Sequence, residues 1–233
     1  MQDYFLKGLL GRASQRGLFS NSFINIRDFS NSKHRKVDDF PYSDHQGMIL
    51  KVDVLARAIS SIDQYAEYRL LYMCPKGPVL SQESINRYSQ ESKGLIIIPG
   101  YYEGIDERLF DLFTIERVSL GNFILSSGEL PALVIAEAVL RQIPDVVGNP
   151  ESVGEDSLLS GLLEYPQYSN PRNYQGLEVP EVLVNGNHKL IETWRRKASI
   201  KHTLFQKPSL LAQLDITDSD KKIIVHALEG DPL

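Results

Sequence analysis

Residues 95–147 read LIIIPGYYEGIDERLFDLFTIERVSLGNFILSSGELPALVIAEAVLRQIPDVV, and this stretch decides the predicted fold. It opens with an unbroken apolar run at residues 95–98, which is typical of a strand buried on both faces. The chain then turns through Gly100 and Gly104, where the missing side chain permits conformations that other residues resist. A second apolar strand is predicted to end near Leu125.

A small-residue loop and a helix follow this second strand. Residues 126–128 are Ser, Ser and Gly, and Pro131 lies where a first helical turn begins. The apolar side chains of residues 133–140 then keep helical spacing. Each of the two strands is therefore followed by a glycine-bearing loop, and such a pair of loops can surround a small ligand with backbone donors.

The remaining sequence alternates predicted helices and strands. The alternation predicts an α/β fold, with a mostly parallel sheet that is covered by helices. Outside the opening stretch, strands are expected at residues 22–27 and 70–73. Helices are expected at residues 2–16, 52–62, 81–90 and 188–200, with two further short helices before residue 228.

The composition and periodicity of the sequence change after Val147, and this change predicts the domain organisation. Residues 148–177 are polar and rich in Pro, Asn, Gly and Tyr, without clear periodicity. We therefore expect a larger α/β domain at residues 1–147, a linker at residues 148–177 and a small all-helical domain at residues 178–233.

Composition limits the class of protein. The chain has 233 residues, of which 42% are hydrophobic and 24% charged, as in ordinary soluble globular proteins. The net charge of -5 argues weakly against a nucleic-acid partner, but residues 186–207 hold six Lys or Arg and one acid. A single cysteine, Cys74, excludes an internal disulfide and a multi-cysteine metal site. Neither a membrane span nor a signal-peptide pattern is present, so a cytoplasmic location is expected.

Three motifs in register resemble one family. GYYEGIDER at residues 100–108, SLGNFILSSGELP at residues 119–131 and VPEVLVNGNH at residues 179–188 are similar to those of the bacterial tRNA (guanine-N1)-methyltransferases, which belong to the knotted SPOUT class. That family methylates guanosine 37 beside the anticodon. The resemblance covers nearly the whole chain. Pattern reasoning alone predicts an ordinary doubly wound sheet, because threaded chains are almost absent from proteins.

The resemblance has further implications for fold and partners. It implies a deep trefoil knot, S-adenosylmethionine as methyl donor and tRNA as partner. It also implies a homodimer whose active site combines residues of two copies, and it suggests that Mg²⁺ assists. No cluster of candidate ligands in the sequence marks a metal site.

Catalysis at N1 of guanine needs a group that removes the N1 proton and a cation that stabilises the charge developing towards O6. The resemblance assigns proton removal to Asp156 and charge stabilisation to Arg141. It implies that Glu103 either contacts the target guanine or orders the pocket. Each assignment has a structural alternative. An Asp before Ser-Leu-Leu can cap a helix, and an Arg in a last helical turn can complement the helix dipole.

The resemblance also points to the residues that would bind the methyl donor, which lie after three strands. Cys74 among them can equally be a small buried thiol. The whole set is Met73, Cys74, Pro75, Gly100, Tyr102, Leu120, Gly121, Asn122, Phe123, Ile124, Leu125, Gly128 and Pro131.

Two basic regions are candidates for contact with RNA. The predicted helix at residues 188–200 would present a basic face to backbone phosphates, with Trp194 expected in the core. Residues 31–40 are basic as well, and this segment is either a solvated loop or an RNA-facing one. The candidate phosphate-binding residues of the helical region are Lys189, Arg195, Arg196, Lys197 and Lys201.

The chain departs from the family pattern at several positions. It begins in its first helix, where family members open with an apolar strand, so either the sheet lacks that strand or the start of the sequence is truncated. Residues 43–46 are Ser-Asp-His-Gln in place of a glycine-rich loop, Tyr101 replaces an Arg and Ser127 replaces a Gly. These changes keep two alternatives open: an RNA- or cofactor-binding protein with impaired catalysis, and a methyltransferase with another RNA target.

Overall fold

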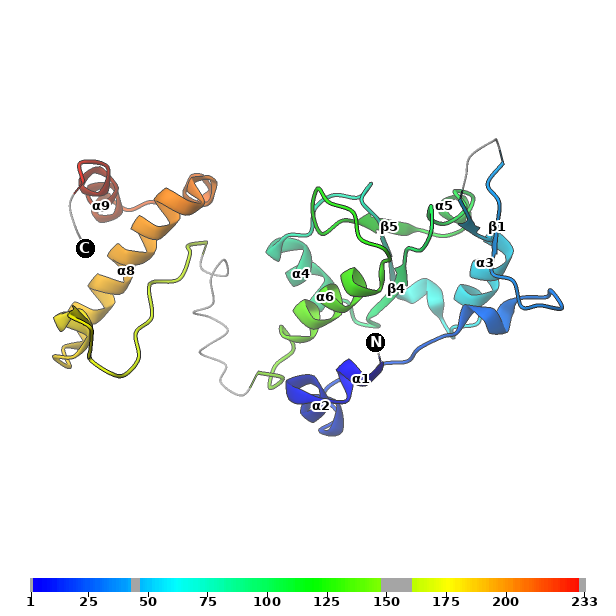
Figure 1. The fold of residues 1–233 in the computed structure, drawn as a ribbon, viewed down its shortest axis with the longest axis horizontal. Coiled ribbons are helices and arrows are strands. Elements are labelled where there is room, and N and C mark those ends of the chain that lie inside the picture. Colours follow the sequence, from blue (N-terminus) through cyan, green and yellow to red (C-terminus); the bar gives the residue numbers. More distant parts are fainter. Residues whose placement is uncertain (1, 43–46, 148–160, 231–233) are drawn as a thin grey trace. The chain divides into compact units, whose positions relative to one another are not determined.

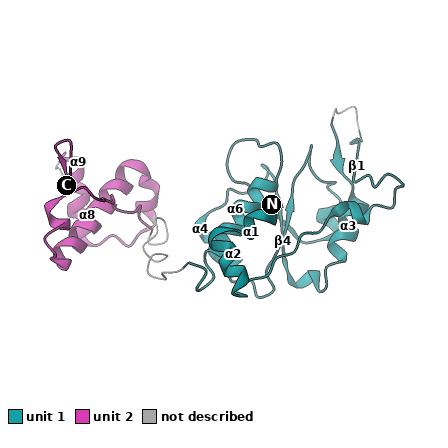
Figure 2. Cartoon of the chain, turned by 60° about the horizontal axis from the view of Figure 1, so that its bottom comes forward, with its two compact units in different colours: residues 1–148 teal, residues 149–233 magenta. Residues whose placement is uncertain are grey.

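The computed structural model describes residues 2–42, 47–147 and 161–230. The chain forms two compact units, Met1–Gly148 and Asn149–Leu233, which are coloured separately in Figure 2. We call them unit 1 and unit 2 and describe each by itself.

Unit 1 is built around a three-stranded parallel sheet (Figure 1). Strand β3 (Arg69–Met73) lies between β4 (Leu95–Pro99) and β5 (Ile115–Val118). Both pairings are parallel, with Leu71 opposite Ile97 on one side and Glu116 on the other. The predicted α/β class and parallel sheet are therefore confirmed.

The central strand sends alternate side chains into two cores, as the two-residue period of a strand requires. Leu70 and Tyr72 pack with α3 (Val52–Ser60) and α5 (Leu109–Leu112) on one face of the sheet. Leu71 and Met73 pack with α4 (Gln82–Ser89) and α6 (Glu129–Leu140) on the other face. Because both faces are covered, an unbroken apolar run suits this strand.

The N-terminal segment packs against α6. Instead of one predicted helix it forms two, α1 (Gln2–Phe5) and α2 (Gly8–Gln15), separated where Gly8 adopts a positive φ of 61°. Their buried side chains, including Phe5 and Leu10, form a small core together with partly buried residues of α6.

Two strand predictions in unit 1 are wrong. Residues 22–25 form no strand, and the chain passes into a 3-10 helix, η1 (Ile26–Phe29), which the Asn25 side chain caps by accepting from Arg27 N at 3.1 Å. The second apolar strand ends at Val118 rather than near Leu125. The Ser119 hydroxyl accepts from Gly121 N at 3.2 Å and turns the chain away from the sheet.

The other elements of unit 1 are short. Strands β1 (Asp38–Asp39) and β2 (Ile49–Leu50) pair antiparallel, and η2 (Tyr65–Glu67) precedes β3. The Ser81 side chain caps α4 as predicted, by accepting from Ser84 N at 3.2 Å. No helix in the described part of the chain has the length and apolar character that a membrane span needs.

Unit 2 is mainly helical. Its long helix α8 (His188–Gln206) packs with η4 (Pro208–Gln213) and α9 (Asp218–Leu228), and η3 (Glu181–Leu183) precedes it. A hairpin of β6 (Asn173–Tyr174) and β7 (Leu177–Glu178), which the sequence pattern did not predict, begins inside the segment expected to be a linker. The core of unit 2 contains Leu162, Ile200 and Leu211.

An ion pair between an exposed arginine and a buried aspartate joins two helices of unit 2. Asp220 is only 4% exposed and accepts from the guanidinium of Arg196 on α8 at 2.9 and 3.2 Å. These hydrogen bonds lower the pKa of Asp220 to about 2, and its place in the capping box of α9 with Thr217 contributes further. The pair therefore stabilises the packing of α9 on α8.

Candidate functional site

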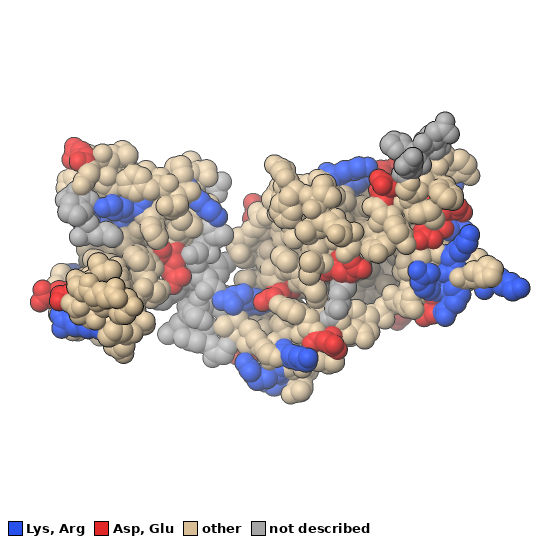
Figure 3. Space-filling view, in the orientation of Figure 1, with Lys and Arg blue, Asp and Glu red and all other residues tan. Residues whose placement is uncertain are grey.

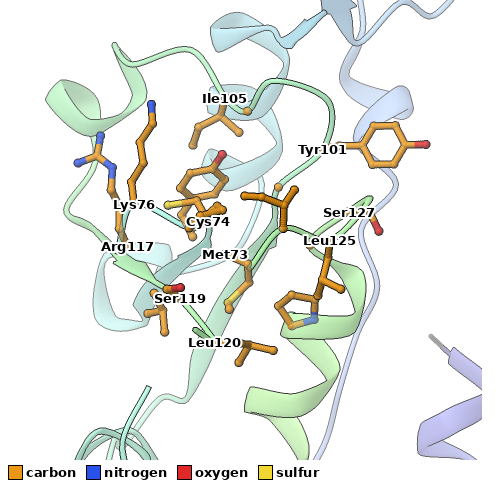
Figure 4. Close-up of a pocket in the computed structure, with 18 of the residues that line it drawn as sticks. Met73, Cys74, Lys76, Tyr101, Ile105, Arg117, Ser119, Leu120, Leu125 and Ser127 are labelled. Carbon is orange, nitrogen blue, oxygen red and sulfur yellow. The ribbon is translucent and has the colours of Figure 1, made fainter. Parts of the chain in front are cut away.

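The carboxyl ends of β3, β4 and β5 meet at one edge of the sheet, and the loops that follow them enclose a cavity of about 400 Å³ (Figure 4). This is the usual position of ligand sites in parallel α/β sheets. We call residues 100–105 the first loop and residues 119–128 the second loop.

The cavity brings together most of the residues that the resemblance assigned to the methyl donor. Asn122 is the one member of that set outside the lining, whereas Glu103, assigned to the guanine, lines the cavity. The predicted residues that line it are Met73, Cys74, Pro75, Gly100, Tyr102, Glu103, Leu120, Gly121, Phe123, Ile124, Leu125, Gly128 and Pro131.

Backbone hydrogen bonds fasten the first loop to the β1–β2 region. Glu103 N donates to Met48 O at 3.0 Å, and Leu50 N donates to Gly104 O at 3.0 Å. Tyr102 adopts a positive φ of 53°, and interaction with the Asp38 carboxylate of β1 raises the pKa of Tyr102. Contacts within unit 1 therefore fix the conformation of the first loop.

The side chain of Tyr72, on β3, lies against the first loop at Gly104. This side chain is buried, and its ring packs edge-on against Phe110. Burial is the main cause that raises the pKa of Tyr72 to about 12, so the hydroxyl stays protonated at physiological pH. A Cβ added at Gly104 would lie 2.9 Å from this hydroxyl, which explains the glycine.

The two loops cross in close contact. Gly128 N donates to Gly100 O at 2.6 Å. A Cβ at Gly128 would overlap with Gly100 N and would lie 2.9 Å from two backbone atoms of Pro99. Only glycine fits at position 128, so the start of α6 is held directly against the end of β4.

The charges at the cavity fall into two groups. Arg117 pairs with Glu107, and its guanidinium carbon lies 3.5 Å from the centre of the Phe110 ring. Lys76 also lines the cavity, but none of the ion pairs among the described residues includes it. Figure 4 shows Lys76 and Arg117 on the same side of the cavity, away from Leu125.

Arg141, another predicted catalytic residue, does not line this cavity. Arg141 is the C-cap residue of α6, at the opposite end of a 12-residue helix from Gly128, which corresponds to about 18 Å. Asp156 lies outside the described residues, as does the altered segment at residues 43–46.

The predicted RNA-binding side chains of α8 differ in their surroundings. Arg196 is held by Asp220, and the guanidinium carbon of Arg195 lies 4.6 Å from the centre of the Tyr165 ring. Lys189 is exposed, and Trp194 is partly buried near Tyr168, with ring centres 6.3 Å apart. Lys197 and Lys201 lie on the same helix.

A second basic surface belongs to unit 1. Figure 3 shows basic side chains gathered at the loop that follows η1. Lys33 and Lys36 are exposed there, and Arg35 pairs with Asp28. The described part of the chain contains no group of three or more His, Cys, Asp or Glu side chains that could hold a metal ion.

Several lining residues were missed by the sequence argument, notably Tyr72, Lys76, Arg117 and Ser119. Tyr72 and Lys76 lie in or shortly after β3, whose end was predicted, whereas Arg117 and Ser119 lie at the end of β5, which was predicted too far along the chain. Once β3 and β5 are placed side by side, the carboxyl ends of both strands must border the same cavity, which would have identified these residues.

Comparison with known proteins agrees with this geometry. The family described as tRNA (Guanine-1)-methyltransferase TrmD matches residues 1–213. The tRNA (guanine-N(1)-)-methyltransferase of Macrococcus caseolyticus is 39% identical over 226 residues, covering 97% of this chain and 93% of the relative. Those of Staphylococcus epidermidis and Desulforamulus reducens are each 40% identical, covering 93% and 97% of this chain and 88% and 89% of the relatives. The chain belongs to the tRNA (guanine-1)-methyltransferase family.

Proposed function

We propose that this protein transfers a methyl group from S-adenosylmethionine to N1 of guanosine 37 in tRNA. The observation that carries the proposal is the cavity at the carboxyl ends of three parallel strands, lined by the first two family motifs. Membership of the family over residues 1–213 supports the same activity.

The cavity suits the proposed methyl donor. Its volume of about 400 Å³ is within the range of small-molecule sites. Leu120, Leu125 and Pro131 offer apolar surface to an adenine ring, while the second loop offers backbone groups. S-adenosylmethionine supplies an electrophilic methyl group on a sulfonium, and the loops would hold that methyl in line with N1.

The chain's own residues would manage the proton and the charge on the base. We assign removal of the N1 proton to Asp156, because N1 is a poor nucleophile while protonated. Arg141 would stabilise the negative charge that develops towards O6, and Glu103, which lines the cavity, would orient the guanine. No step is assigned to Mg²⁺, since the described residues offer no ligand cluster for it.

Helix α6 supports a homodimer as the working form. Apart from Glu129 and Glu137 its residues are apolar, and apolar helix surface is normally buried. Leu130 and Val134, one turn apart on α6, are nevertheless 62% and 46% exposed. A second copy would cover this surface, and a dimer would allow Asp156 of one copy to serve the cavity of the other.

Two finer features of the proposal concern topology and RNA. The close crossing of Gly128 and Gly100 supports a knotted path of the chain after β4. The exposed Lys189 on α8, with Lys197 and Lys201 on the same helix, supports a phosphate-binding role for unit 2. A tRNA substrate would place the protein in the cytoplasm.

The test is methyl transfer with purified protein, S-adenosylmethionine and tRNA transcripts that carry guanosine or adenosine at position 37. We expect 1-methylguanosine in digests of the first transcript and none from the second. Asp156→Asn should abolish transfer and leave titration with S-adenosylhomocysteine unchanged. Ligand and tRNA binding without any product would contradict the proposal and indicate a binding protein, whereas product at another position would indicate another RNA target.

A further inference from the structure

Lys76 is a cation at the cavity that the protein does not neutralise in the described part of the chain. Its neighbour at the cavity, Arg117, is paired with Glu107 and covers the Phe110 ring. Lys76 is exposed, lines the same cavity and takes part in none of the ion pairs among the described residues. Of the four charged side chains that line the cavity, Lys76 and Glu103 thus stay outside the ion pairs of the described residues, and Lys76 is the positive charge available to a ligand.

The backbone at Lys76 is held in place, although its side chain is long. Gly77 N donates to Cys74 O at 3.4 Å and closes a turn directly after β3. A Cβ at Gly77 would lie 2.5 Å from Val118 N, so this turn packs tightly against β5. The turn positions the Lys76 ammonium at one side of the cavity, beside Arg117 (Figure 4).

The two sides of the cavity differ in chemistry. Leu120, Leu125 and Pro131 make one side apolar, which suits a planar nucleobase. The side with Lys76 suits an anion, because a buried or half-buried carboxylate needs a cationic donor. A ligand that spans the cavity would therefore have an aromatic ring at one end and a negative group at the other.

We propose that Lys76 binds the carboxylate of the amino-acid portion of the methyl donor and so selects ligands that carry it. The inference rests on the proposed function, because it names the group that the same cavity recognises. The ammonium Nζ would donate to a carboxylate oxygen, a charge-assisted hydrogen bond that a neutral side chain replaces poorly. Lys76 is thus a specificity-determining residue and takes no part in proton transfer.

The test compares two ligands that differ only in this carboxylate, S-adenosylhomocysteine and its decarboxylated counterpart S-adenosyl-3-thiopropylamine. Calorimetric titration of the full chain needs neither RNA nor turnover. We expect the wild-type protein to bind S-adenosylhomocysteine about tenfold more tightly. Lys76→Gln should lose this preference by weakening S-adenosylhomocysteine alone, and Lys76→Arg should keep it. Lys7→Gln, which changes an exposed lysine outside the cavity, should behave like wild type.

Each other outcome has a definite meaning. If Lys76→Gln weakens both ligands equally, or keeps the preference, Lys76 does not recognise the carboxylate and the inference is wrong, although the proposed function stands. If Lys76→Gln binds S-adenosylhomocysteine normally but loses affinity for tRNA, the lysine contacts phosphate instead. If the wild-type protein binds neither ligand, the proposed function fails together with the inference.

Discussion

The first and second loops leave neighbouring parts of one sheet and border one cavity, yet only the first is fastened along its length. Residues 100–105 are tied to Met48 and Leu50 by backbone hydrogen bonds. Among the described residues, the hydrogen bonds of residues 119–128 lie at the two ends of the loop. Ser119 bonds within its own turn and to Pro78 and Leu80, and Gly128 bonds to Gly100 and Ala132.

The side chains of the two loops also differ in burial. The first loop ends in Ile105, which is 6% exposed and belongs to a core. In the second loop Phe123, Ile124 and Leu125 are 54%, 79% and 41% exposed. Apolar side chains in this position are stabilised when a ligand or a partner covers them. The first loop is therefore held in its conformation by unit 1 itself. The second loop exposes apolar side chains, and its stability depends on the ligand or partner that covers them.

The largest expected effect comes from the point where the two loops meet. Gly128→Ala would place a Cβ into the backbone of Gly100 and Pro99, which cannot move aside like a side chain. We expect a loss of about 3 kcal/mol or more in the free energy of unfolding, and no binding of S-adenosylhomocysteine that calorimetry can detect. Denaturant unfolding and calorimetry measure the two effects.

Gly17→Ala is the matched control for this substitution. Gly17 has a positive φ of 72°, but nothing lies within 4 Å of an added Cβ. Only backbone strain of about 1–2 kcal/mol is expected there, with ligand binding retained. Equal effects of the two variants would show that the contact between the loops is unimportant.

A smaller effect is expected from loosening the first loop alone. Tyr72→Phe removes the buried hydroxyl that lies against Gly104 and should cost about 1–2 kcal/mol in the free energy of unfolding. Amide hydrogen exchange should rise in residues 100–105 and stay unchanged in residues 119–128. A rise in both loops would contradict the division between them.

The raised pKa of Tyr72 adds a dependence on pH. Its pKa is about 12 in the fold and about 10 when unfolded, so the neutral hydroxyl is favoured by folding. This contribution to stability is complete below pH 10 and is lost as the pH rises from about 10 to about 12. Tyr72→Phe should flatten the fall in stability across that window, which unfolding experiments at a series of pH values can follow.

The difference between the loops also explains what could be predicted from sequence. Strands β3 and β4 were recognised because burial on both faces requires long apolar runs. The apolar run Phe123-Ile124-Leu125 was mistaken for a strand for the opposite reason, since its side chains are apolar although no sheet buries them. A run of apolar residues indicates that its side chains are to be shielded from water. It does not identify the sheet, ligand or partner chain that shields them.

The cavity residues illustrate the same limit. Glycine-bearing loops and the family motifs predicted the lining at Gly100, Leu120 and Leu125. Tyr72 and Lys76 became visible only when β3 was placed between β4 and β5, because pairing of strands is a property of three dimensions. In unit 2, the basic pattern identified α8 but could not show that Arg196 is committed to Asp220. The role of Asp156 and the boundaries of the expected linker stay predictions.

The smallest effect on stability is expected in the second loop itself. Ile124 is 79% exposed, so Ile124→Ser should change the free energy of unfolding of the monomer by less than about 0.5 kcal/mol. If a second copy covers this loop and α6, the same change should weaken dimerisation about tenfold, as measured by sedimentation equilibrium. Leu112→Ser is the control, because Leu112 is 61% exposed on α5, on the other face of the sheet from α6. An unchanged dimer with weaker S-adenosylhomocysteine binding would show that the ligand, rather than a second copy, covers the open wall of the cavity.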